Sequence, residues 1–125
     1  MRFKLGAEIP VGTVVYKKAY STKSGNYYYN RVIDDSYIIT GIVTKPGFCP
    51  TRNEDFKCRV AEILVTKIED LDGKKVDITE LVSGHNINFK YKLYSKAHST
   101  LDYRKDRVCT RGIHVFLSKK LAREW

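Results

Sequence analysis

Lysine, arginine and tyrosine alternate in three short segments of the 125-residue chain, and this pattern is the clearest candidate for chemistry. The segments are 16–20, 27–31 and 90–96. Nucleobases stack on aromatic rings for about 1–3 kcal/mol each, while lysine and arginine neutralise phosphate groups. The pattern predicts a surface for a nucleotide or for single-stranded nucleic acid. It is equally typical of a half-buried sheet with solvated lysines, and both interpretations stay open.

The densest run of positive charge lies at 104–107, with Arg111 shortly before the last apolar strand. Arginine in such a loop can hold a phosphate with two parallel hydrogen bonds. We predict phosphate contacts from eight basic residues: Lys17, Lys18, Lys90, Lys92, Arg104, Lys105, Arg107 and Arg111. The predicted stacking residues are Tyr16, Tyr20, Tyr28 and Tyr94, and His114 is a candidate for the wall of a pocket.

Three cysteines and His114 raise two further possibilities. Zinc would accept thiolates and an imidazole, but the spacing of Cys49, Cys58, Cys109 and His114 lacks the paired cysteines of recognisable zinc sites. A nucleophilic pair of Cys109 and His114 is disfavoured, because residues five apart in a strand lie on the order of 16 Å apart on opposite faces. We therefore predict that these side chains pack in the core, and we predict no catalytic residue, metal or cofactor.

The odd number of cysteines also makes a disulfide framework unexpected. No apolar run approaches the roughly 20 residues that span a bilayer, and the amino-terminal residues are too polar for a signal peptide. These features predict a reduced, cytoplasmic protein without a membrane partner.

The elements that must position these residues are mostly strands. Residues 13–20, 37–44, 59–68 and 113–117 are rich in β-branched and aromatic side chains, and residues 89–94 alternate apolar and polar. Asp72-Gly73 predicts a hairpin with residues 74–78 as its return, and Ser118 can cap a helix over 119–125. Gly41 predicts a bulge, and 45–55 reads as the longest loop. The expected fold class is α+β: one domain over 1–125, a small, mainly antiparallel sheet or partly open barrel with a short C-terminal helix.

The formal charge of +9 is unevenly distributed along the chain. Residues 1–33 carry a net +5, residues 34–80 a net −3, and residues 81–125 a net +7. If the two basic ends meet in the fold, they form a face that attracts phosphates or an acidic surface. A lysine-rich surface without a specific partner has the same composition.

Four segments carry a resemblance to a known family: Tyr16-Lys17-Lys18, Lys57-Cys58-Arg59-Val60-Ala61, Phe89-Lys90-Tyr91-Lys92 and Cys109-Thr110-Arg111-Gly112-Ile113-His114-Val115-Phe116. In this order they resemble an uncharacterised domain family of phages and giant viruses, sometimes found beside pentapeptide repeats. Leu93 stands where that pattern has glycine, and Val115 where it has phenylalanine. The resemblance implies a phage or viral setting and supplies no activity.

A shorter likeness concerns residues 112–116 with Ala122 and Trp125, which are similar to the glycine–aromatic strand and helix of ADP-ribosyltransferases. His114 occupies the position of an essential tyrosine there, and the chain ends before the strand that would bring a catalytic glutamate. The likeness implies at most a degenerate nucleotide pocket.

Together these features predict a small phage or viral accessory protein that binds a nucleotide or single-stranded nucleic acid without catalysis. The first alternative is a module that docks an acidic host protein. The second is a nucleotide-processing enzyme on a degenerate ADP-ribosyltransferase-like scaffold. A homodimer is compatible with the sequence.

Overall fold

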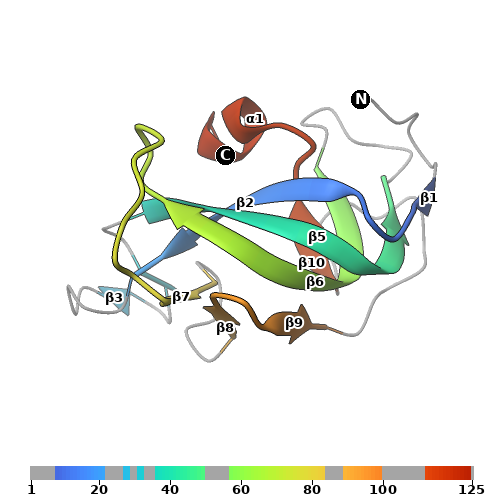
Figure 1. The fold of residues 1–125 in the computed structure, drawn as a ribbon, viewed down its shortest axis with the longest axis horizontal. Helices are drawn as coiled ribbons and strands as arrows, with labels where there is room; N and C mark the ends of the chain where they lie inside the picture. The colour runs from blue at the N-terminus through green and yellow to red at the C-terminus, as the bar shows by residue number, and fades with distance from the viewer. Residues whose placement is uncertain are drawn as a thin grey trace.

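A computed structural model describes residues 8–21, 27–28, 31–32, 36–49, 57–83, 89–99 and 112–124 (Figure 1), with the backbone alone at 27–28 and 31–32. Its elements are β1 (Glu8–Ile9), β2 (Val14–Tyr20), β3 (Tyr27–Tyr28), β4 (Arg31–Val32), β5 (Ser36–Phe48), β6 (Cys58–Glu69), β7 (Glu80–Val82), β8 (Lys90–Lys92), β9 (Lys96–His98), β10 (Ile113–Val115) and α1 (Lys119–Glu124).

Eight strands form one antiparallel sheet in the order β10-β6-β5-β2-β7-β8, with β1 on β5 and β9 on β6. The sheet curls so that β8 and β9 approach each other, although no ladder joins them among the described strands. The result is a nearly closed barrel with one unsealed seam and a short C-terminal helix. This confirms the predicted fold class.

The β5–β6 pair contains the two longest strands of the barrel. Its register shifts twice, between Thr40 and Gly41 and between Val43 and Lys45, so the predicted bulge at Gly41 is confirmed. Bulges bend and twist a strand, which lets these two strands wrap around the core. β5 continues to Phe48 through residues predicted to be a loop. Gly47 makes this possible, because a Cβ there would overlap the backbone of β6.

The barrel interior is lined by alternate residues of its strands. On β2, Val15 and Ala19 are fully buried and lie opposite Gly41 and Tyr37 of β5. Lys17 lies between them on the same strand face, opposite Ile39. The strand that carries the first basic–aromatic segment therefore turns its middle lysine toward the core.

Helix α1 covers the outer face of β2 and β5. Its first turn is capped by Ser118, whose Oγ accepts from the Leu121 N–H at 3.2 Å, as the sequence predicts. Just before the helix, Phe116 and Tyr16 exchange two backbone hydrogen bonds of 2.8 Å, which tie the end of β10 to β2. Ala122 packs with Ile38 and Phe116 beneath the helix.

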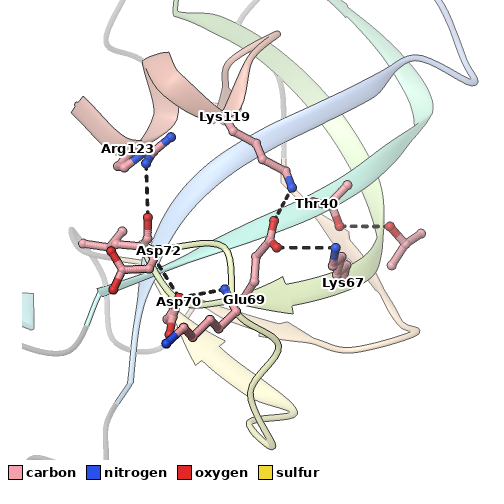
Figure 2. Close-up of polar contacts among 10 residues, drawn as sticks. Thr40, Lys67, Glu69, Asp70, Asp72, Lys119 and Arg123 are labelled. Carbon is pink, nitrogen blue, oxygen red and sulfur yellow. Dashed lines mark hydrogen bonds and ion pairs between the residues drawn. The ribbon is translucent and has the colours of Figure 1, made fainter.

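The hairpin after β6 differs from its prediction in one respect. Asp70 Oδ1 accepts from the N–H groups of Asp72 and Lys74, both at 2.9 Å, so an acidic side chain shapes this turn (Figure 2). The return segment makes only an isolated bridge, Glu69 with Lys75, and the next strand begins at Glu80. The predicted return strand over 74–78 is therefore wrong.

The expectation against a disulfide is also wrong. Cys49 and Cys58 form a disulfide with a Cα–Cα distance of 4.3 Å. They lie opposite each other because Phe48 pairs with Arg59 in the antiparallel β5–β6 ladder. The odd count gave no warning, since two of three cysteines can pair; Cys109 lies outside the described residues. In the ranges that the structure describes, no helix is long and apolar enough to cross a membrane.

Candidate anion-binding surface

Three lysines and a histidine project outward from strands β8 and β9. Lys90 and Lys92 flank the inward-facing Tyr91 on β8, and Lys96 and His98 flank the buried Ala97 on β9. All four outward side chains are more than half exposed. With Tyr94, which lies in the turn, they form a surface that we call the β8–β9 strip: Lys90, Lys92, Tyr94, Lys96 and His98.

Tyr94 is the most exposed large apolar residue among those described, with 75% of its surface accessible. Its φ of 64° is in the left-handed region, where a side chain is disfavoured by roughly 1–2 kcal/mol. Hydrogen bonds hold this conformation: the Tyr94 N–H donates to the Val65 carbonyl at 2.8 Å, and the Ser95 N–H to the Lys92 carbonyl at 3.1 Å. The fold thus holds the Tyr94 backbone in a conformation that places the ring in solvent, at a backbone cost. Such strain is most often retained where a site requires it.

Glu80 partly balances the first half of the strip. Its two carboxylate oxygens lie 3.5 Å from Lys90 Nζ and 4.0 Å from Lys92 Nζ. One carboxylate cannot neutralise two ammonium groups, and exposed pairs of this kind contribute about 0–1 kcal/mol. The lysines remain available to a ligand.

Glu62 lies beneath the second half of the strip. Its side chain is 12% exposed, and Oε1 accepts from Thr44 Oγ1 at 2.9 Å. Three nitrogen groups surround the carboxylate: Lys45 Nζ and Lys96 Nζ at 3.9 Å, and His98 Nδ1 at 3.5 Å. The residues come from three neighbouring strands, because Lys45 and His98 both lie opposite Glu62 in the ladders of β5 and β9.

Lys17 does not join this surface. Its ammonium group lies inside the barrel, donates to the His114 carbonyl at 2.9 Å, and is 5.9 Å from the centre of the Tyr91 ring. Burial, and then the charge of Lys57, lower the pKa of Lys17 to about 8. Burial also raises the pKa of Tyr91. A cation enclosed in this way is not placed for contact with a phosphate in solution.

The other predicted residues on β2 face outward, but their side chains are partly buried and do not offer an open surface for stacking. Tyr16 packs against the cluster beneath α1, with Lys119 Nζ 5.9 Å from its ring centre. Lys18 and Tyr20 follow on the same face and are partly buried, and burial raises the pKa of Tyr20. Tyr28 belongs to β3, where only the backbone is described. Arg104, Lys105, Arg107 and Arg111 lie outside the described residues.

His114 contributes its backbone carbonyl to Lys17, and its partly buried side chain lies on β10. Cys58 cannot act as a thiolate ligand while it is bonded to Cys49. No group of three potential metal ligands occurs in the described part of the chain. The zinc hypothesis thus loses two of its four proposed ligands.

An apolar cleft of about 550 Å³ opens at the turn before β2, lined by Pro10, Val11, Gly12, Thr13, Val14, Tyr16 and Leu117. Of the predicted site residues, only Tyr16 borders it, and no cationic side chain is among its lining residues. The cleft is therefore separate from the basic surface.

Sequence reasoning missed the role of Glu62, Glu80 and His98, and it did not include Lys96 among the contacts. Lys96 could have been found, since it continues the alternating segment that begins at Lys90. The partners of Glu62 come from segments 17 to 36 residues away, so no local pattern marks them.

Comparison with known proteins places the chain without assigning it an activity. No curated protein matches it, and no solved structure does. A family model, described as a family of unknown function (DUF5758), matches residues 6–122 and so spans nearly the whole chain. The chain belongs to this family of unknown function, DUF5758.

Proposed function

We propose that the protein binds single-stranded nucleic acid through the β8–β9 strip. The observation that carries this proposal is Tyr94, which lies between Lys92 and Lys96 with its ring exposed. Its backbone conformation is held by the hydrogen bonds from the Tyr94 N–H to the Val65 carbonyl and from the Ser95 N–H to the Lys92 carbonyl. A base can stack on this ring while the flanking ammonium groups contact the phosphates on either side.

The geometry favours an extended ligand over a ligand enclosed in a pocket. The cationic groups follow one another along β8 and β9, and the described cleft lies at the start of β2 instead. Two side chains of a β-strand that face the same way are about 7 Å apart. Lys96 and His98 thus offer repeated contacts along a strand of nucleic acid.

The phage or viral setting is a further part of the proposal and depends on the sequence motifs described above. In that setting the protein acts as an accessory factor in the host cytoplasm that coats host or viral nucleic acid. No chemistry is required of it, because stacking and charge neutralisation supply the affinity.

The test compares wild-type protein with Tyr94→Gly. Fluorescence anisotropy with mixed-sequence 12-nucleotide DNA and RNA, at about 50 mM salt, should show binding by the wild-type chain. Loss of the ring should weaken binding by about 5- to 100-fold, because stacking contributes about 1–3 kcal/mol per base. Glycine tolerates the left-handed backbone, so the unfolding free energy should stay the same or rise by up to about 1 kcal/mol. Lys74→Ala removes an exposed lysine on a different turn and is the matched control.

Two results would overturn the proposal. The first is no detectable binding of either oligonucleotide by the wild-type protein. The second is unchanged affinity of Tyr94→Gly for the oligonucleotides, which would show that they do not bind through the strip. Pull-down from a host lysate addresses the acidic-protein alternative, since a partner retained after nuclease treatment would favour a protein-docking module.

A further inference from the structure

The Glu62 cluster, which consists of Thr44, Lys45, Glu62, Lys96 and His98, has more cations than its carboxylate can neutralise. Lys45 and Lys96 carry two positive charges against one negative charge, and His98 adds a third when it is protonated. The separations of 3.9 Å from the two ammonium groups to the carboxylate exceed ordinary hydrogen-bond distances. Their donors therefore remain available to another acceptor.

Glu62 holds the side chains of Lys45, Lys96 and His98 near one point. Its side chain is recessed, with 12% exposed, and the Thr44 hydroxyl fixes one of its oxygens. The lysine and histidine side chains above it are 54–62% exposed and converge from β5 and β9. Holding flexible lysines near one point lowers the entropy cost of binding a ligand there.

We propose that the Glu62 cluster is a site for a phosphate monoester. A monoester carries about −1.5 to −2 charges near neutral pH and offers three acceptor oxygens, whereas an internal diester carries one charge. Three convergent donor groups match the monoester better. The inference builds on the proposed function, because Lys96 and His98 belong to the β8–β9 strip and the cluster ends that strip beyond Tyr94.

The monoester can belong to the end of a strand or to a free mononucleotide, and matched ligands separate the two. The experiment compares one 12-nucleotide sequence with a 5′-phosphate, a 3′-phosphate or hydroxyl groups at both ends. A nucleoside monophosphate and inorganic phosphate are titrated separately, with backbone amide shifts of β5, β6 and β9 as the readout. We expect one terminal phosphate to increase the affinity about 5- to 20-fold.

Lys45→Ala is the decisive variant, because Lys45 lies on β5 and is not part of the strip. It should abolish the gain from the terminal phosphate and leave binding of the unphosphorylated oligonucleotide within about twofold of wild type. His98→Ala should reduce the gain as well, and Lys74→Ala should not. Circular dichroism and thermal unfolding confirm that each variant is folded before affinities are compared.

The outcomes distinguish this inference from the proposed function. Equal binding of all three oligonucleotides overturns the monoester site and leaves the nucleic-acid proposal standing. Binding of inorganic phosphate that depends on Lys45, without oligonucleotide binding, supports the site and overturns the proposed function. A gain that survives Lys45→Ala places the phosphate elsewhere and overturns the assignment.

Discussion

At the scale of single residues, Lys17 shows how strand packing can remove a basic group from the binding surface. The residue as a whole is partly accessible, but its ammonium group is enclosed between the His114 carbonyl and the Tyr91 ring. One good acceptor does not replace the hydration of a charged group, so the charged form is disfavoured. This cost is the physical origin of its lowered pKa.

We predict that Lys17→Met stabilises the protein at pH 7 by on the order of 1–2 kcal/mol. The substitution removes a poorly solvated charge and keeps a flexible apolar stem, although it also removes the hydrogen bond from Lys17 to the His114 carbonyl. Chemical denaturation at pH 7 gives the difference in unfolding free energy. Lys18→Met, one residue away on the outer face, is the control and should change stability by less than about 0.5 kcal/mol.

The pH dependence follows from the pKa of Lys17, which is about 8 in the folded protein against 10.5 ordinarily. Below pH 8 Lys17 is protonated in both the folded and the unfolded chain, so the folded protein bears the full cost of burying the charge. Between about pH 8 and 10.5 the unfolded chain binds more protons, so wild-type stability rises with pH. The advantage of Lys17→Met should therefore shrink across this range. A constant advantage up to pH 10 would contradict the assignment of a buried ammonium group.

At the scale of elements, α1 is held to the barrel by a charge cluster as well as by apolar contacts (Figure 2). Glu69 at the end of β6 is buried and receives Lys119 from the helix and Lys67, the latter at 3.4 Å. Arg123 Nη1 donates to the Leu71 carbonyl at 3.3 Å. The six-residue helix is too short to be stable alone, so these contacts determine whether it stays on Tyr16 and Phe116.

Lys119→Ala should lower the unfolding free energy at pH 7 by about 1–2 kcal/mol. The buried Glu69 carboxylate loses one of two counter-ions, while the partial exposure of Lys119 limits the cost. Chemical denaturation measures the effect. Lys120→Ala is the control, because it makes the same lysine-to-alanine change in helix propensity on the exposed side of the same helix. It should have little effect on the unfolding free energy.

Acid should erase this difference. Burial alone would raise the pKa of Glu69, but hydrogen bonds and charge from Lys119 and Lys67 outweigh it and hold the pKa below 4.5. The stabilisation is thus present above about pH 4.5 and lost as pH falls through the lowered value. An undiminished gap between wild type and Lys119→Ala in strong acid would refute an ionic role for Glu69.

At the scale of the whole molecule, the lysines of the β8–β9 strip gather on one side of the barrel. β8 and β9, with the strip, lie on the side of the barrel opposite α1 (Figure 1). The acidic residues of the middle segment are placed differently: Glu69 lies under α1, Asp70 shapes a turn, and Glu62 and Glu80 pair with strip lysines. The strip thus carries three lysines against the two carboxylates of Glu62 and Glu80, so an excess of positive charge remains there.

Binding through this surface should be strongly dependent on salt. Neutralising three phosphates, with Lys90, Lys92 and Lys96, gives a slope of log K against log salt of about −2 for a single strand. The affinity should therefore fall about 20-fold between 50 and 200 mM salt. Lys92→Ala should reduce the slope by about 0.7, and Lys74→Ala should leave it unchanged. A slope near zero would show that lysine–phosphate contacts do not drive binding.

Much of the fold could be predicted from local sequence. β-branched and aromatic runs identified β2, β5 and β6, alternation over 89–94 identified the segment that contains β8, and Ser118 identified the start of α1. These features depend on neighbours in the chain, where propensity and capping act. Lys90, Lys92 and Tyr94 were placed together for the same reason.

The tertiary structure decided what local patterns leave open. Strand alternation places Lys17 and Lys18 on opposite faces of β2. Only the closing of β2, β10 and β8 around the core decides that the face with Lys17 is the interior one. The pairing of Cys49 with Cys58 required the β5–β6 register, which bulges shift. By itself, the sequence identified the central parts of β2, β5 and β6 and the segments in which lysine and tyrosine alternate. Contacts between distant segments decided which lysines are exposed to solvent and which carboxylates they pair with. The reason is that strand pairing sets the face and the neighbours of every side chain.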